Sequence, residues 1–80
     1  AGADKISQLL TKGIQELPPQ RKQVFELRLA GLNYEQIAAE MGISKNTVRN
    51  QVVSALASLR ELLRKNGELS VLIFFYFFSE

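Results

Sequence analysis

Residues 31–50 read GLNYEQIAAEMGISKNTVRN, and this stretch predicts two helices joined by a tight turn. Asn33 is placed to begin the first helix as its N-cap, with Gln36 three residues later as its capping-box partner. Ser44 is placed to cap the second helix. Between the two helices, Gly42 can adopt the left-handed backbone conformation that a sharp turn requires. The pattern is typical of a helix-turn-helix unit.

The apolar residues of this stretch are spaced so that the two helices can pack against each other. Two hydrophobic staples are predicted, Leu32 with Ile37 and Ile43 with Val48. Ala38 has to be small because the second helix crosses over it. An ordinary helical hairpin is the alternative interpretation. The shortness of the first helix and the polar start of the second disfavour it.

On either side of this unit, the sequence predicts further helices and therefore an all-α domain. Asp4 is expected to cap the first helix, and Pro18 and Pro19 end that helix and begin the next. Gly13 inside the first helix costs about 1 kcal/mol relative to alanine. The four predicted helices cover about 4–16, 19–30, 34–41 and 45–66. They form a four-helix helix-turn-helix domain without winged elements over residues 1–67, and a hydrophobic tail occupies residues 68–80.

The composition excludes several classes of function. The chain has 80 residues, with 10 Lys and Arg against 8 Asp and Glu, and it contains neither Cys nor His. Zinc sites of the usual ligand types, disulfides, thiol nucleophiles and imidazole acid–base catalysts are therefore ruled out. No carboxylate pair, nucleophile–base couple or phosphate loop stands at a usable spacing. The sequence accordingly predicts neither an enzyme nor a bound cofactor.

The positive charge is concentrated on the last predicted helix. Residues 43–66 carry five positive charges and one negative, whereas residues 1–42 carry five of each. If Val48 marks the buried face, the opposite face gathers Asn46, Arg49, Asn50, Val53, Arg60 and Arg64, with Ser44 and Lys45 at its N-terminal rim. Arg60 and Arg64 lie about 16 to 22 Å along the helix from Arg49 and are interpreted as surface charge, or as contacts to a distal phosphate or a protein. Arginine can bind a guanine edge and asparagine an adenine edge. This face therefore predicts insertion into a DNA major groove, and an ordinary solvated face is the alternative.

Beyond these features, the ordered motifs resemble a known family. The runs LPPQRKQVF (17–25), GLNYEQIA (31–38) and MGISKNTV (41–48) are similar to the C-terminal domain, region 4, of bacterial sigma factors. The extracytoplasmic-function group is the most similar. The resemblance implies a cytoplasmic domain that binds the −35 promoter element, docks on the flap of the RNA polymerase β subunit and is masked by anti-sigma factors. It also implies that the chain is a fragment of a longer factor that carries a promoter-melting region.

The resemblance assigns roles to individual residues. Four would face the DNA: Lys45, Asn46, Arg49 and Asn50. Three would lie near the DNA backbone: Arg21, Tyr34 and Ser44. Gln51 and Ser54 stand where family members often carry basic residues, which implies a weaker grip on phosphate. The output domain of response regulators is the alternative family, although it usually reads Leu-Thr-x-Arg-Glu where this chain has Leu-Pro-Pro-Gln.

The hydrophobic tail contains eight consecutive apolar residues, VLIFFYFF, at 71–78. As a helix this run would span about 12 Å, whereas the hydrocarbon core of a bilayer is about 30 Å thick, so no membrane span is predicted. Two alternatives stay open. The tail forms a short fifth helix that completes the core, or it fills a hydrophobic groove of this chain or of a neighbour. If the groove belongs to a neighbouring copy, residues 69–78 would drive homo-oligomerisation, and the chain would act as a protein-interaction module.

Overall fold

The computed structural model describes residues 2–67 of the chain, and within them it contains four helices and no strand. The helices are α1 (Gly2–Gln15), α2 (Pro19–Leu29), α3 (Tyr34–Met41) and α4 (Lys45–Lys65). The prediction of an all-α, four-helix helix-turn-helix fold is thereby confirmed. The predictions for the tail lie outside the described residues.

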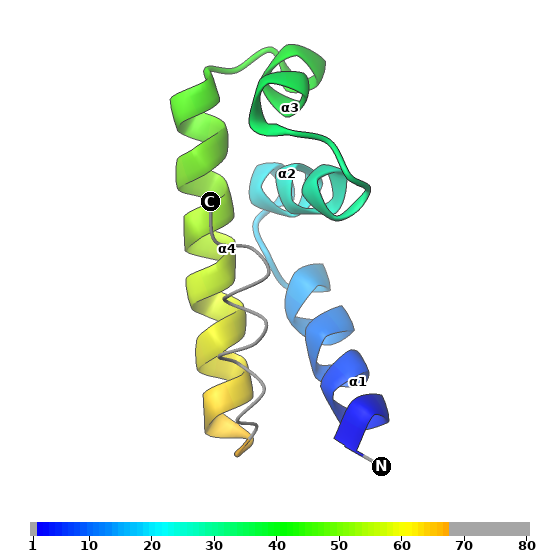
Figure 1. The fold of residues 1–80 in the computed structure, drawn as a ribbon. Coiled ribbons are helices and arrows are strands. Elements are labelled where there is room, and N and C mark those ends of the chain that lie inside the picture. The colour runs from blue at the N-terminus through cyan, green and yellow to red at the C-terminus, as the bar shows by residue number, and fades with distance from the viewer. Residues whose placement is uncertain (1, 68–80) are drawn as a thin grey trace.

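The longest helix, α4, is the element on which the other three assemble. α1, α2 and α3 each contact it, and α2 also contacts both α1 and α3. Figure 1 shows α1 beside the C-terminal half of α4 and α3 beside its N-terminal end, with α2 between them. The two halves of α4 therefore have different neighbours.

The turns between the helices follow the predicted caps. The Asn33 side chain accepts a hydrogen bond from the Gln36 backbone N–H at 2.8 Å, and the Gln36 side chain accepts one from the Asn33 N–H at 2.9 Å. The Ser44 hydroxyl accepts from the Thr47 N–H at 3.0 Å. Gly42 has a φ of 67°, in the left-handed region that favours glycine. The capping box, the Ser44 cap and the glycine turn are all confirmed.

The start of α1 differs from the sequence prediction. The helix begins at Gly2, so Asp4 lies inside it and is not its N-cap. A favourable cap contributes only about 1 kcal/mol, and helix ends readily shift by a residue or two. The capping preference of one aspartate is therefore too small to fix where this helix begins.

Gly13 lets α1 approach α4 closely. A Cβ atom at this position would lie 2.6 Å from Cδ2 of Leu59 and 2.8 Å from Cδ2 of Leu62. The residue itself is buried. The helix propensity lost at Gly13 is therefore exchanged for close packing between two helices that are distant in sequence.

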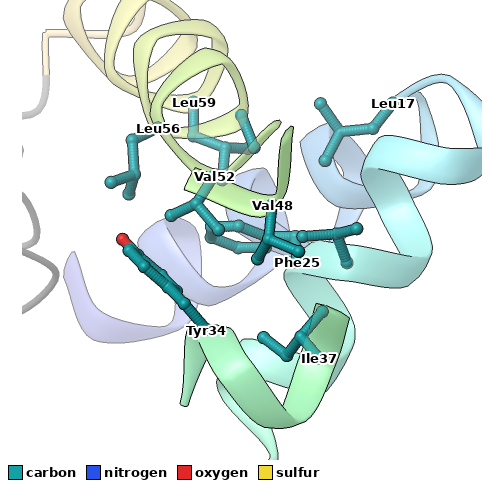
Figure 2. Close-up of a cluster of buried hydrophobic side chains, with 10 residues drawn as sticks. Leu17, Phe25, Tyr34, Ile37, Val48, Val52, Leu56 and Leu59 are labelled. Atoms are coloured by element: carbon teal, nitrogen blue, oxygen red, sulfur yellow. The ribbon is translucent and has the colours of Figure 1, made fainter. Parts of the chain in front are cut away.

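The core joins all four helices around the inner face of α4. Phe25 from α2, Ile37 from α3, and Val48 and Val52 from α4 are fully buried. Figure 2 shows these side chains converging between the helices. The predicted staple partners Leu32 and Ile43 pack against the same cluster. Because Val48 and Val52 point inward, the opposite face of the first turns of α4 is turned to solvent.

Candidate DNA interface

The first turns of α4 carry an exposed polar face, which we call the recognition surface. It consists of Ser44, Lys45, Asn46, Arg49, Asn50 and Val53, all exposed to solvent. The side chain of Val53 is apolar, yet 54% of its surface is accessible. The structure thus brings together the residues that the helical spacing placed on one face. The buried valines on the other side of α4 hold this face outward.

Two members of the recognition surface have partners within the fold. The Ser44 hydroxyl caps α4 and lies 2.8 Å from the Thr47 hydroxyl. Nζ of Lys45 lies 3.5 Å from Oε1 of Glu35 at the start of α3, and 62% and 78% of these two side chains are exposed. An ion pair this exposed contributes at most about 1 kcal/mol, so Lys45 can exchange the carboxylate for a phosphate at little cost.

Beside Lys45, a polar hollow of about 180 Å³ lies at the N-terminus of α3. Its lining includes Arg28, Asn33 and Glu35. Arg28 is held in place because its guanidinium donates to the Leu32 carbonyl at 3.3 Å. The N-terminus of α3, with the cations Arg28 and Lys45 beside it, favours the binding of an anion. The carboxylate of Glu35 opposes such binding.

Tyr34 lies in the core and not on the recognition surface. Only 7% of the residue is exposed, and the Arg28 guanidinium carbon lies 5.6 Å from the centre of its ring. Figure 2 shows the ring among the apolar side chains of the cluster. Its expected place near the DNA backbone stays a prediction, and the structure leaves little of this side chain for such a contact.

Arg21 lies on α2, outside the recognition surface, and is tied to α4. Its Nε donates a hydrogen bond to Oε1 of Gln51 at 3.0 Å. Nε2 of Gln51 in turn donates to Oε1 of Gln20 at 2.7 Å. Sequence reasoning noted Gln51 only as a departure from the family pattern. Its contact with Arg21 depends on how two helices meet, and no local signal in the sequence indicates it.

The C-terminal half of α4 has a different character. Nε of Arg64 donates to Oε2 of Glu61 at 3.1 Å, and a second hydrogen bond joins the same two side chains. This contact lowers the pKa of Glu61 and raises that of Arg64. At 1.5 Å per residue, Arg64 lies about 22 Å along the helix from Arg49. It therefore does not belong to the recognition surface.

An apolar groove of about 530 Å³ also runs along the C-terminal half of α4. It lies between this helix and the end of α1, and its lining includes Leu17, Ala57 and Leu62. Among residues 2–67, the structure contains no cluster of acidic side chains suited to a metal ion and no helix long and apolar enough to cross a membrane.

The capped two-helix turn and the exposed polar face of α4 define the class of this protein, a helix-turn-helix domain of the DNA-binding type. The family model described as "Sigma-70, region 4" matches residues 7–59, and the chain belongs to this family. The role of the family is DNA binding in promoter recognition by sigma factors, and it is not a known enzyme family. No curated protein and no solved structure matches the chain. The match favours the sigma-factor prediction over the response-regulator alternative.

Proposed function

We propose that this domain recognises the −35 element of promoters by inserting the first turns of α4 into the major groove. The observation that carries the proposal is the recognition surface, where Lys45, Asn46, Arg49 and Asn50 stand exposed on a helix anchored by its opposite face. A helix fits the major groove, and the N-terminal residues of a recognition helix are those that reach base edges.

Base recognition would depend on the middle of this surface. Arg49 can bind the O6 and N7 of guanine, and Asn46 or Asn50 can bind the N6 and N7 of adenine. Val53 supplies an apolar surface for a thymine methyl group. Arg49 forms no hydrogen bond or ion pair with the other residues that the structure describes, so binding DNA would break no contact there.

Contacts with the DNA backbone would come from the edges of the surface. Lys45 and Ser44 lie at the start of α4, and Arg21 approaches from α2. Tyr34 stays in this set only as what the family resemblance implies; its buried ring lies 5.6 Å from the Arg28 guanidinium carbon, and Arg28 lines the polar hollow at the start of α3. Such contacts fix the position of the domain on the duplex without reading its sequence.

Selection of duplexes from a random pool by the 80-residue chain tests this function. We expect an enriched sequence motif that is no longer than one helical turn of the duplex. The motif should contain guanine or adenine at fixed positions. The affinity should also fall steeply as salt is raised, because phosphate contacts release counterions. Recovery of duplexes with no shared motif would argue against sequence recognition.

We further propose that the apolar groove beside α1 receives RNA polymerase, through the flap of its β subunit. Its support is an open apolar surface on the half of α4 that does not bear the recognition surface. An anti-sigma factor would compete for the same groove, and the domain would act in the cytoplasm, where the chromosome lies. Self-association through residues 69–78 remains a proposal for the tail.

Ala57→Arg tests the groove, because Ala57 is exposed and lines it. We expect at least a 10-fold loss of affinity for core polymerase, with duplex binding unchanged, because a charged side chain would occupy the apolar surface. Arg49→Ala is the matched control and should show the opposite pattern. An Ala57→Arg variant that binds polymerase normally would remove the groove from the proposal.

A further inference from the structure

We infer that Gln51 is a positioning residue, which holds the Arg21 guanidinium ready for a phosphate of the bound duplex. This inference rests on the proposed DNA binding and deepens it. The two side chains come from α4 and α2, and the 3.0 Å hydrogen bond between Nε of Arg21 and Oε1 of Gln51 joins the helices. At the sequence level Gln51 implied a weaker grip on phosphate, and the geometry gives it the reverse effect.

The chemistry of the two groups fixes the orientation of the glutamine amide. A guanidinium has only donors, so the amide oxygen of Gln51 must face Arg21. Its NH₂ group then points away and donates to Gln20 at 2.7 Å. If the amide turned over, its NH₂ group would face the Arg21 guanidinium and the hydrogen bond from Nε would be lost. The contact with Arg21 therefore fixes the orientation of the amide, and the hydrogen bond to Gln20 is compatible with it.

The hydrogen bond also selects which edge of Arg21 is presented. Nε is occupied by Gln51, and among the described residues neither terminal nitrogen has a hydrogen bond. These two nitrogens form the edge that can bind a phosphate with two parallel hydrogen bonds. A long arginine side chain loses rotamer freedom when it binds, and a hydrogen bond formed in advance reduces that loss.

The position of Gln51 links this phosphate contact to base recognition. It follows Asn50 of the recognition surface and precedes Val52, which is fully buried. The backbone at Gln51 is therefore held by the core. If Arg21 binds a phosphate while Gln51 holds it in place, the phosphate contact from α2 is fixed relative to the recognition surface of α4. The phosphate contact then sets the register of the recognition helix on the duplex.

Gln51→Met tests the inference, because methionine keeps the length of the side chain and removes both hydrogen bonds. The probe is a mixed-sequence duplex of about three helical turns, since phosphate contacts do not depend on sequence. We expect about 3- to 10-fold weaker binding, the equivalent of ordering one long side chain. For Gln51→Met, the slope of log affinity against log salt concentration should become shallower than in the parent. It should approach the slope of Arg21→Ala, which loses about one phosphate contact.

A double-mutant cycle separates positioning from a general structural effect. In the Arg21→Ala background, Gln51→Met should weaken binding no further, because no guanidinium is left to position. The matched control is Gln8→Met on α1, an exposed glutamine for which we expect no change. An undiminished loss in the Arg21→Ala background, or no loss in the single variant, would overturn the inference.

Two readouts distinguish this inference from the proposed function. In the absence of DNA, the Arg21 Nε–H resonance should be protected from exchange in the parent and unprotected in Gln51→Met; a resonance that is unprotected in both overturns the positioning role. On a duplex selected for sequence-specific binding, a loss of binding for Arg49→Ala but not for Gln51→Met leaves the proposed function standing and rejects the inference. A parent chain that binds no duplex rejects both.

Discussion

The two halves of α4 belong to one continuous helix, yet they face different surroundings. In the N-terminal half, Asn46, Arg49 and Asn50 are exposed opposite a face buried against α2 and α3. In the C-terminal half, Arg64 is paired with Glu61, and the helix packs so closely on α1 that only glycine fits at position 13 without a shift. The comparison teaches that one helix can present a recognition surface at one end, where its opposite face is buried, and pack closely on a second helix at its other end.

The largest effect is expected from Ile37→Ala, which removes a fully buried side chain of α3 from the core cluster. The free energy of unfolding should fall by about 2–5 kcal/mol, from lost apolar burial and the cavity left behind. Urea denaturation followed by circular dichroism measures this. An effect within 0.5 kcal/mol, roughly that of a surface substitution, would contradict the placement of Ile37 in the core.

The next effect concerns the C-terminal half of α4, which packs on α1. Gly13→Val should lower the free energy of unfolding by about 1–3 kcal/mol, because its side chain would overlap Leu59 and Leu62. Thermal melting measures it, with Thr11→Val, an exposed position of the same helix, as the control. Where the variant is still folded, its affinity for duplex DNA should match that of the parent. If a fully folded Gly13→Val variant lost much of its affinity for DNA, the assignment of DNA binding to the N-terminal half of α4 alone would be wrong.

The ion pairs of the two halves offer a smaller contrast. Glu35→Gln should tighten duplex binding by up to about 5-fold, because it removes a negative charge near the DNA and releases Lys45. Fluorescence anisotropy at low salt measures the change, and the difference should shrink as salt is raised. Glu61→Gln is the matched control and should alter binding less, since its carboxylate lies in the other half of α4.

The smallest effect is a dependence on pH. The hydrogen bond from Arg64 holds the pKa of Glu61 below its ordinary value of 4.5. Since the folded pKa lies below the unfolded one, this contact stabilises the fold above about pH 4.5 and is lost as the pH falls through the folded value. The parent should therefore lose slightly more stability in acid than Glu61→Gln does, as compared by denaturation at neutral pH and near pH 3. An identical acid response of the two proteins would contradict the pairing.

The parts of the fold that the sequence predicted are those that local chemistry decides. The Asn33 capping box, the Ser44 cap and the Gly42 turn each depend on residues within a few positions of one another. The exposed face of α4 follows from helical periodicity once Val48 is placed inward. The same local features position the candidate site, because the Ser44 cap begins α4, the helix that carries the recognition surface.

The parts that sequence reasoning missed depend on contacts between distant segments. Gly13 was interpreted as a cost to its helix, and its role emerges only where Leu59 packs on it. Gln51 was interpreted as a missing basic residue, and its partner Arg21 lies 30 positions earlier in the chain. The place of Tyr34 near the DNA backbone stays a prediction, and its burial in the core is a feature that the local sequence does not indicate. Pattern and propensity do not indicate which side chains meet across helices that are distant in the sequence.

The most direct test of the central claim compares Arg49→Ala with Arg64→Ala on the same selected duplex. Each substitution removes one positive charge from an exposed position of α4, so the general electrostatic change is matched. Anisotropy titration should show a loss of about 10-fold or more for Arg49→Ala, the cost of one good base contact, and a loss of less than about 3-fold for Arg64→Ala. Equal losses, or no loss for either variant, would contradict the assignment of the first turns of α4 to the major groove.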